Sequence, residues 1–356
     1  MASWQFVYAK RFAFYPPDYD SPGLGGSEAV LVILTRALAA RGHDVTVYNC
    51  CYRPGRYDGV AWRPLHELPA APWPDLRVAV RYEESVSDAP AGRELFWMLD
   101  NRPEDAVSFE RRPCFQEGSV VVASRAMATV AKRGGLQSVP THIPHPVETW
   151  LYPAADTAPR APTCLYASIA ERGLDVLLEI WPRVRAAVPS AKLCVTSGFE
   201  LWGFTKSESA ALSQPIFDIA RQTDGVQLLG VLDRDQLRQM QAQSALLVYP
   251  CRDEEMFCLS VAEAAAAGTP TVTSDSHALA ERVGDGDTGF LIKGCIDEQK
   301  TKDQFVDQTV KLLTDSPLRS AMGIRAQRLA QELDARTIAM RWEKLFCSTS
   351  ADTPDA

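Results

Sequence analysis

Two carboxylates, Glu255 and Glu263, have the chemistry and spacing in this sequence that best suit ligand binding. They flank a short alanine-rich helix, which is expected to begin near Leu259 or Ser260, with Ser260 as its cap, and to end at Gly268 in the left-handed conformation. The first N–H groups of a helix have no partner within the helix and attract anions, while carboxylates accept hydrogen bonds from hydroxyls. The stretch therefore predicts a site for a ligand with hydroxyls and phosphate oxygens, such as a sugar nucleotide.

A second candidate for anion contact precedes the first long helix. Gly25 and Gly26 allow a close approach of the backbone to a ligand, and Ser27 is expected to cap a helix that runs to Arg41. An ordinary flexible loop and cap would explain these residues equally well. For the first site, two glutamates eight residues apart often occur by chance, and residues 253–255 could form a solvated acidic turn. The motif is not G-x-G-x-x-G, so the fingerprint of a dinucleotide site is absent.

The composition describes a globular protein with room for two domains: 356 residues, of which 46% are hydrophobic and 24 are prolines. The net charge of −8 has no basic run to offset it, which argues against nucleic acid as a partner. The nine cysteines form no C-x-x-C pair and no metal-binding pattern, so we expect reduced thiols in a cytoplasmic protein. No apolar run approaches the roughly 18 residues of a membrane span, which leaves peripheral membrane contact open.

Short apolar strands and amphipathic helices alternate along the chain. In the first half, strands are expected at 5–9, 45–48, 77–80, 95–98, 120–123 and 141–143. In the second half, strands are expected at 163–168, 192–196, 226–229, 246–249, 270–273 and 289–292, with helices at 174–188, 207–223 and 233–243, and from 301 onward. This alternation predicts α/β domains with doubly wound parallel sheets, in which ligands bind at the carboxyl ends of the strands. The Pro/Ala-rich stretch 153–162 is the expected linker, so the domains are assigned to residues 1–157 and 158–334.

Several separated motifs, in this order, resemble family 4 glycosyltransferases of the GT-B fold. They are Gly25-Gly26-Ser27-Glu28, Ile143-Pro-His-Pro-Val147, Glu171-Arg-Gly-Leu174, Leu229-Gly230-Val231, Glu255-Met-Phe-Cys-Leu-Ser-Val-Ala-Glu263 (E-x7-E) and Asp287-Thr-Gly-Phe-Leu291. The resemblance implies two facing Rossmann-like domains with a cleft between them, 1–157 on the acceptor side and 158–334 on the donor side. It also implies that residues 335–350 form a terminal helix that crosses back to the first domain, although an ordinary amphipathic helix fits the pattern as well. Residues 351–356 are expected to be a disordered tail.

The resemblance assigns donor-binding roles. Glu263 would accept hydrogen bonds from the ribose hydroxyls, and Glu255 would hold a hydroxyl of the transferred sugar. Arg172 would clamp the diphosphate, unless it forms only a surface ion pair with Glu171 or Asp175. The remaining positions are backbone contacts to sugar, phosphate or base at Gly25, Gly26, Ser27, Gly198, Val231, Phe257, Cys258 and Leu259.

One departure from the family concerns the first domain. The family's histidine position is occupied by Leu99, followed by Asp100, which is expected to act with Glu255 at the catalytic centre and in acceptor binding. A leucine cannot hydrogen-bond a sugar, so a catalytically weak or inactive nucleotide-sugar-binding protein is the alternative. A Rossmann oxidoreductase is disfavoured by the missing dinucleotide fingerprint.

The resemblance implies transfer of a sugar from a nucleotide-diphosphate sugar to an acceptor hydroxyl with retention of configuration, in carbohydrate or glycan biosynthesis. The acceptor would be a glycan, a lipid-linked molecule or a small molecule. No Asp-x-Asp metal motif is evident, because Asp18-Tyr-Asp20 falls in a loop assigned to the acceptor side, so neither metal nor cofactor is expected.

Overall fold

The computed structural model describes residues 1–9, 12–88, 90–113, 115–155 and 158–347. They form two compact units: unit 1 contains Met1–Tyr19, Gly26–Pro146 and the chain from Leu333, and unit 2 contains Asp20–Gly25 and Val147–Glu332. The predicted tail at 351–356 and residues 348–350 of the predicted terminal helix lie outside the described residues.

The division between the units falls between Pro146 and Val147, rather than at the predicted boundary of 157 and 158. The predicted linker belongs to unit 2 because its polar groups are bound there. The Gln327 side chain donates to the Pro153 carbonyl (2.8 Å) and accepts from the Ala155 N–H (2.6 Å), while Arg160 donates to Thr269 Oγ1 at 2.7 Å. The described residues of this Pro/Ala-rich segment, 153–155 and 158–162, lie outside the helices and strands and belong to unit 2.

Unit 1 is built on one sheet of strand order β3-β4-β2-β1-β5-β6-β7-β8. Its strands are β1 (Ser3–Val7), β2 (Asp44–Asn49), β3 (Gly55–Tyr57), β4 (Val60–Pro64), β5 (Leu76–Val80), β6 (Arg93–Trp97), β7 (Val120–Val122) and β8 (Thr141–His142). Among these strands, β3 pairs with β4 in the antiparallel direction and the other neighbours are parallel. Its helices are α1 (Pro17–Asp20), whose last residue belongs to unit 2, α2 (Gly26–Ala40), α3 (Pro103–Glu110), α4 (Arg125–Arg133) and α12 (Ala335–Cys347).

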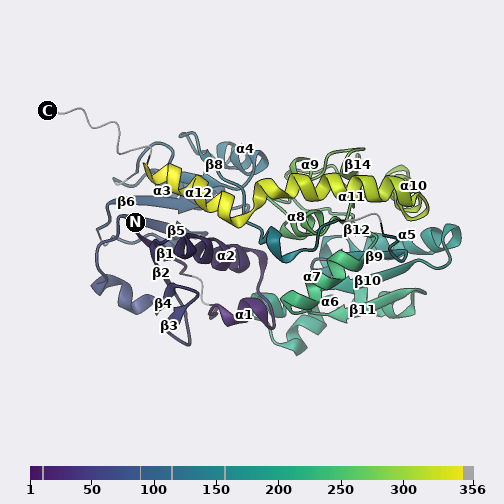
Figure 1. Ribbon diagram of the computed structural model, residues 1–356, viewed down its shortest axis with the longest axis horizontal. Coiled ribbons are helices and arrows are strands. Elements are labelled where there is room, and N and C mark those ends of the chain that lie inside the picture. Colours follow the sequence, from purple (N-terminus) through teal and green to yellow (C-terminus); the bar gives the residue numbers. More distant parts are fainter. Residues whose placement is uncertain (10–11, 89, 114, 156–157, 348–356) are drawn as a thin grey trace. The chain divides into compact units, whose positions relative to one another are not determined.

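Unit 2 is built on a parallel sheet of order β11-β10-β9-β12-β13-β14 (Figure 1). Its strands are β9 (Thr163–Ala167), β10 (Lys192–Thr196), β11 (Val226–Gly230), β12 (Leu246–Tyr249), β13 (Thr271–Ser274) and β14 (Gly289–Ile292). Its helices are α5 (Leu174–Ala187), α6 (Lys206–Gln222), α7 (Arg234–Gln243), α8 (Leu259–Ala266), α9 (Leu279–Arg282), α10 (Gln299–Thr314) and α11 (Ser316–Ala330). Short 3-10 turns occur at Leu65–Ala70, Glu83–Ser85, Thr149–Leu151, Ala170–Arg172, Phe199–Trp202 and Gln331–Leu333.

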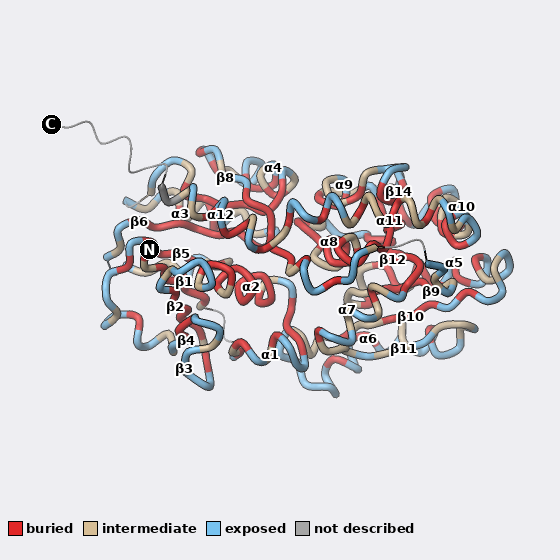
Figure 2. Tube along the Cα trace, viewed as in Figure 1, coloured by how far each residue is buried: buried red, intermediate tan, exposed pale blue. Residues whose placement is uncertain are grey.

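Several strands of both sheets are buried along their whole length. Every residue of β5, β6, β12 and β13 is buried. Figure 2 shows the labelled strands β5, β6 and β12 in red. Burial on both faces explains why their sequences are continuous apolar runs rather than alternating patterns. The sequence-based prediction of parallel-sheet α/β units is therefore confirmed, and each of its strands is found to within a few residues.

The edge hairpin β3–β4 was not predicted, although its sequence carries a turn signal. Asp58 (φ 49°) and Gly59 (φ 82°) occupy the two turn positions. Asp-Gly is favoured where both central residues of a two-residue hairpin turn have positive φ. The flanking strand β3 has only three residues, so its hydrophobic pattern is too short to show a strand.

The terminal helix α12 belongs to unit 1, although it follows unit 2 in the sequence. It packs against α2, beside which it lies in Figure 1. The Trp342 ring is buried, with its centroid 5.2 Å from that of Trp97. Arg41 forms an ion pair with Glu343 of this helix, Nε to Oε1 at 2.6 Å.

Candidate functional site

Unit 2 brings Arg172, Glu255 and Tyr249 together beyond the carboxyl ends of β9 and β12. Arg172 Nη1 lies 3.5 Å from Glu255 Oε2, and the Tyr249 hydroxyl donates to the same oxygen at 3.2 Å. Arg172 Nε also lies 3.0 Å from Asp253 Oδ2. The three side chains place a guanidinium, a carboxylate and a phenol within hydrogen-bonding reach of one another.

The alternative pairing of Arg172 with Glu171 or Asp175 is wrong. Glu171 accepts a hydrogen bond from Ser213 at 2.7 Å, and Asp175 forms an ion pair with Arg252 at 2.7 Å. Arg172 is directed instead toward the β12 exit.

Gly173 makes this direction possible. It has φ 121°, and a Cβ at this position would lie 1.8 Å from the Pro250 carbonyl oxygen. Only glycine tolerates such a close approach together with a positive φ. The β9–α5 connection can therefore lie directly against the segment after β12, which carries Glu255.

The charges of this cluster are well defined. Burial raises the pKa of Tyr249, and Glu255 adds to the shift, so the phenol stays protonated and can donate. Burial by itself would lower the pKa of Arg172, but Glu255, Tyr249 and Asp253 act in the opposite direction, and the net pKa is raised. Arg172 is therefore a permanent cation beside an oxygen-rich loop.

The start of α8 differs from the prediction. The residue before the helix is Cys258 in the left-handed conformation (φ 64°), and its side chain makes no capping hydrogen bond. Ser260 is not the cap, because its hydroxyl donates to the Ala167 carbonyl of β9 at 2.7 Å. A tertiary partner has thus replaced the local one. Gly268 ends the helix region with φ 66°, as predicted.

Phe257, Cys258 and Leu259 lie at this helix start, as the spacing indicated. The first-turn N–H groups therefore stand close in sequence to Glu255, and Cys258 does not cap them by its side chain. A helix start of this kind favours anionic oxygens.

Glu263 is buried inside unit 2, with 3% of its side chain exposed. Arg234 Nη2 lies 2.5 Å from its Oε1, and the Gln241 amide donates to its Oε2 at 3.3 Å. Neither partner was predicted. The pair depends on the packing of α7 against α8, and no local pattern relates positions 234 and 263.

Gly198 and Val231, which were expected beside the base, do lie together after β10 and β11. A Cβ at position 198 would meet Val231 Cγ2 at 2.5 Å, so this contact requires glycine. The following 3-10 turn carries Trp202, whose ring centroid is 6.0 Å from Arg172 Cζ. An aromatic face thus adjoins the cationic group.

The glycine-rich segment is divided between the two units. The Gly25 N–H donates to the Leu201 carbonyl at 3.0 Å within unit 2, whereas Gly26 begins α2 in unit 1. Ser27 therefore lies inside the first turn of α2, and its predicted role as the cap is wrong.

Unit 1 contains a separate cluster at the carboxyl ends of its strands. Asp100, after β6, forms an ion pair with Arg81, after β5. Arg81 also contacts Tyr8, after β1, and Glu28 of α2, while Leu99 is 6% exposed. Arg81 and Tyr8 were not singled out from the sequence, although a polar residue directly after an apolar strand is the signal that locates this edge of a parallel sheet.

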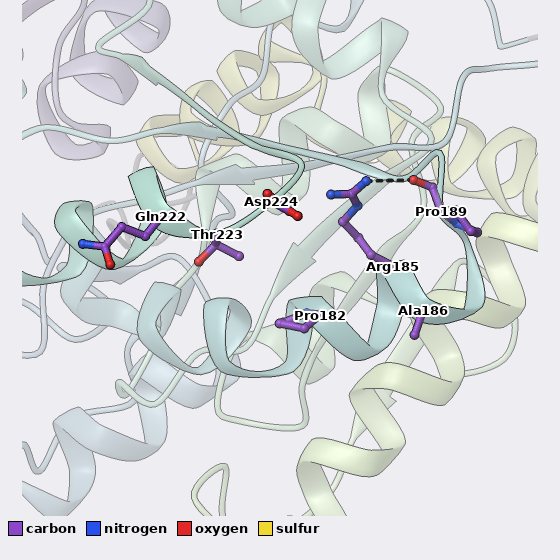
Figure 3. Close-up of a pocket in the computed structure, with 7 residues that line it drawn as sticks. All are labelled: Pro182, Arg185, Ala186, Pro189, Gln222, Thr223 and Asp224. Carbon is purple, nitrogen blue, oxygen red and sulfur yellow. Dashed lines mark hydrogen bonds between the residues drawn. The ribbon is translucent and has the colours of Figure 1, made fainter.

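A surface pocket of about 540 Å³ lies at the opposite end of the unit 2 sheet (Figure 3). Its lining residues precede β10 and β11, whereas the predicted donor-binding residues follow the strands; they are Pro182, Arg185, Ala186, Pro189, Gln222, Thr223 and Asp224. Arg185 points to the Pro189 carbonyl, to which it donates at 3.0 Å. The pocket therefore contains none of the predicted site residues.

Two features are absent from the described part of the chain. No helix there is both long and apolar enough to cross a bilayer. No three His, Cys, Asp or Glu residues there are grouped so that they could hold a metal ion.

Comparison with known proteins finds a similarity in the second unit. Residues 161–315 match the family model of Glycosyl transferases group 1. This region contains Arg172, Glu255 and Glu263. The lipopolysaccharide 1,2-N-acetylglucosaminetransferase of Salmonella typhimurium is 26% identical over 177 residues, which are 49% of this chain and 44% of that protein. The D-inositol 3-phosphate glycosyltransferase of Corynebacterium aurimucosum is 32% identical over 114 residues, 32% of this chain and 26% of that protein. The chain thus aligns with less than half the length of these curated relatives.

Solved structures are similar over almost the entire chain. Anabaena HepE in complex with UDP-glucose has a TM-score of 0.71 at 17% identity, covering 98% of this chain and 100% of that one. Sucrose-phosphate synthase from Thermosynechococcus elongatus has a TM-score of 0.74 at 17% identity, with 99% and 100% covered. At this identity the similarity establishes the fold, which is the GT-B type with two parallel-sheet α/β units.

Proposed function

We propose that this protein is a retaining glycosyltransferase of family 4, which transfers a sugar from a nucleotide-diphosphate sugar to an acceptor hydroxyl. The observation that carries the proposal is the cluster of Arg172, Glu255 and Tyr249 at the carboxyl ends of β9 and β12. Ligands of open α/β sheets bind at this edge. The match of residues 161–315 to group 1 glycosyltransferases supports the same conclusion.

The donor roles follow from the chemistry of each group. Arg172 binds the diphosphate, since a guanidinium presents paired N–H donors to phosphate oxygens. Glu255 accepts from a hydroxyl of the transferred sugar, and the first-turn N–H groups at 257–259 bind sugar and phosphate oxygens. Gly198 and Val231 lie against the base. Glu263 is assigned to the ribose hydroxyls in addition to its bonds with Arg234 and Gln241, since each carboxylate oxygen can accept more than one hydrogen bond.

Leaving-group stabilisation then comes from fixed charges of the chain. As the bond from sugar to phosphate breaks, negative charge grows on the diphosphate, next to Arg172 and the start of α8. A helix end contributes about 0.3–1 kcal/mol at an exposed site, and preorganised donors contribute more where water is excluded. We propose that the reaction needs neither a metal ion nor a cofactor.

The acceptor is assigned to unit 1, where Asp100 binds its hydroxyl, with Gly26 and Ser27 near the diphosphate. Two of the relatives are named for lipopolysaccharide and inositol 3-phosphate. We propose that the acceptor of this protein is a glycan, a lipid-linked molecule or a small molecule. We also propose that the protein is cytoplasmic and contacts a membrane only peripherally.

A thermal-shift panel tests the donor site. UDP, GDP, TDP and their sugars are compared, because a ligand at about 100 times its Kd stabilises the folded state by about 2.7 kcal/mol. Arg172→Met should weaken the binding of nucleoside diphosphates more than the binding of nucleoside monophosphates. The control is Arg183→Met, which removes an exposed ion pair between Arg183 of α5 and Asp303 of α10. Equal losses of affinity for nucleoside diphosphates and monophosphates would contradict the proposed contact of Arg172 with the diphosphate.

Transfer and its stereochemistry are measured with the best donor. Product formation in EDTA tests independence from metal, and the anomeric coupling constant in the NMR spectrum of the product tests retention. An inverted product would refute the retaining mechanism.

The second candidate function is nucleotide-sugar binding without turnover, and it is motivated by buried Leu99. Binding without hydrolysis or transfer, together with activity gained by Leu99→His, would favour it. A rise in melting temperature with NAD(H) alone would point instead to an oxidoreductase.

A further inference from the structure

Unit 1 gathers four ionisable side chains from four separate elements. Arg81 Nη1 lies 3.1 Å from the Tyr8 hydroxyl and 3.1 Å from Glu28 Oε1. Arg81 Nε donates to Asp100 Oδ2, and the Tyr8 hydroxyl donates to Glu28 Oε1. These four residues, here called the Arg81 cluster, stand at the carboxyl ends of β1, β5 and β6 and in the first turn of α2.

The Arg81 cluster has one more formal negative charge than positive. Burial raises the pKa of Tyr8, and Glu28 adds to the shift, so this phenol stays neutral and the two carboxylates face one guanidinium. Glu28 is 2% exposed, Arg81 15% and Asp100 29%. Asp100 is therefore the more exposed of the two carboxylates.

The backbone at Arg81 is strained. Its φ is 72°, a left-handed conformation that costs free energy for a residue with a Cβ. The turn is held because the Arg81 N–H donates to the Trp97 carbonyl at 2.9 Å, and the guanidinium lies 5.0 Å above the Tyr82 ring. Strain of this kind concentrates at functional sites. A buried ionic network is also a poor source of stability, which again favours a functional reason for it.

Two atoms of the cluster remain available to a ligand. Within the residues that the structure describes, Arg81 Nη2 and Asp100 Oδ1 have no hydrogen-bond partner, while the other atoms of both head groups are engaged. A guanidinium N–H beside a carboxylate oxygen offers one donor and one acceptor. A hydroxyl, which both donates and accepts, complements this pair.

We infer that Arg81 and Asp100 together bind the acceptor hydroxyl, with Glu28 and Tyr8 as positioning residues, and that the acceptor is uncharged around that hydroxyl. The inference rests on the proposed function and deepens its acceptor side. The Asp100 carboxylate accepts from the hydroxyl, and Arg81 donates to its oxygen. The surplus negative charge of the cluster disfavours an acceptor with a phosphate or carboxylate beside the reacting hydroxyl.

The experiment separates acceptor use from donor use. Acceptor-independent hydrolysis of the nucleotide sugar reports on the donor site. Transfer to methyl α-glucoside, methyl α-mannoside and N-acetylglucosamine is compared with transfer to their 6-phosphates. The variants are Arg81→Met, Arg81→Lys and Asp100→Asn. The matched control is Arg102→Met, whose guanidinium also lies over the Tyr82 ring (5.4 Å) but pairs with Asp105.

We expect Arg81→Met and Asp100→Asn to raise the acceptor KM at least tenfold and to reduce transfer by a larger factor than they reduce donor hydrolysis. Arg81→Lys keeps the positive charge but loses the several N–H donors of the guanidinium. It should therefore melt at the same temperature as wild type and still bind the acceptor more weakly. The control Arg102→Met should change neither the acceptor KM nor the rate of donor hydrolysis. An unchanged acceptor KM, a preference for the 6-phosphates, or equal losses in hydrolysis and transfer would overturn the inference.

Failure of the proposed function would give a different result. In that case the wild-type protein neither hydrolyses nor transfers any nucleotide sugar. Saturation-transfer NMR with the same methyl glycosides then decides the role of the Arg81 cluster. Binding that Arg81→Met abolishes supports it, and wild-type protein that binds none of the glycosides overturns it.

Discussion

The buried ion pair between Arg234 and Glu263 leads to the sharpest stability prediction. Only 8% and 3% of these side chains are exposed, and their charged atoms are 2.5 Å apart. Arg234→Met keeps most of the side-chain volume but removes the cation. Glu263 would then retain the amide of Gln241 as its recorded partner, at 3.3 Å. Breaking a buried pair in this way costs about 3–5 kcal/mol, because a buried charge is left without compensation.

The expected change in melting temperature is large. In a unit of 150–250 residues, each 1 kcal/mol shifts the midpoint by about 2–4 °C, so Arg234→Met should melt roughly 6–20 °C below wild type. The assay is differential scanning fluorimetry, checked by urea unfolding of the full chain.

A double-mutant cycle tests the reason for the shift. Glu263→Gln in the Arg234→Met background removes both charges, so the double variant should be less destabilised than the sum of the two single variants. The exposed pair of Arg183 and Asp303 provides the control, since Arg183→Met should cost less than about 1 kcal/mol. The reasoning is refuted if Arg234→Met melts within 2 °C of wild type, or if the two changes are simply additive.

The same variants report on the ribose. If Glu263 accepts from the ribose hydroxyls, wild-type protein should bind a ribonucleoside diphosphate more tightly than its 2′-deoxy form, and Glu263→Gln should reduce this preference. Calorimetric titration of both nucleotides measures it. A preference that survives the substitution would remove Glu263 from the ribose site.

Three further predictions concern other parts of the chain. Hydrogen bonds from Arg41 and His43 lower the pKa of Glu343, so the stability from this contact is fully present above the unfolded pKa near 4.5 and is lost as the pH falls through the folded pKa. Urea unfolding should show the stabilities of wild type and Glu343→Gln converging as the pH falls below 4.5 and through the folded pKa. A constant difference would contradict this. Burial raises the pKa of Cys251 to about 11 and that of Cys258 well above its ordinary value, so peptide mass spectrometry after iodoacetamide treatment at pH 8 should find exposed Cys295 labelled first, whereas rapid labelling of Cys258 would be inconsistent with the described burial. Gly173→Ala should lower the melting temperature and nucleotide-diphosphate affinity together, because the added Cβ would meet the Pro250 carbonyl at 1.8 Å; a variant equal to wild type in both would refute the need for glycine there.

Local features of the sequence predicted the elements well and their side-chain partners poorly. Strands such as β12 and β13 can be predicted from the sequence because a strand buried on both faces has a continuous run of mostly apolar residues. The expected cap at Ser260 shows the limit of local reasoning. A serine near a helix start is a good cap in isolation, yet its hydroxyl bonds to Ala167, far away in sequence.

The division of the chain shows the same limit on a larger scale. The Pro/Ala composition of 153–162 predicted an interdomain linker, but the contacts of Arg160 and Gln327 assign its described residues to unit 2. The membership of α12 in unit 1 was expected only from the family resemblance. Composition describes flexibility and polarity, and these do not specify which surface a segment packs against.

The sequence by itself determined the alternation of strands and helices, the glycine end of the helix after Glu263 and the edge of each sheet where polar residues follow the strands. These depend on interactions over a few residues, which a local pattern records. Only the tertiary structure decided that Glu263 pairs with Arg234, that Arg172 turns toward Glu255, and that Arg81 joins Asp100 to Glu28. Each of these contacts joins residues from different elements, so it exists only once the sheets and helices have packed.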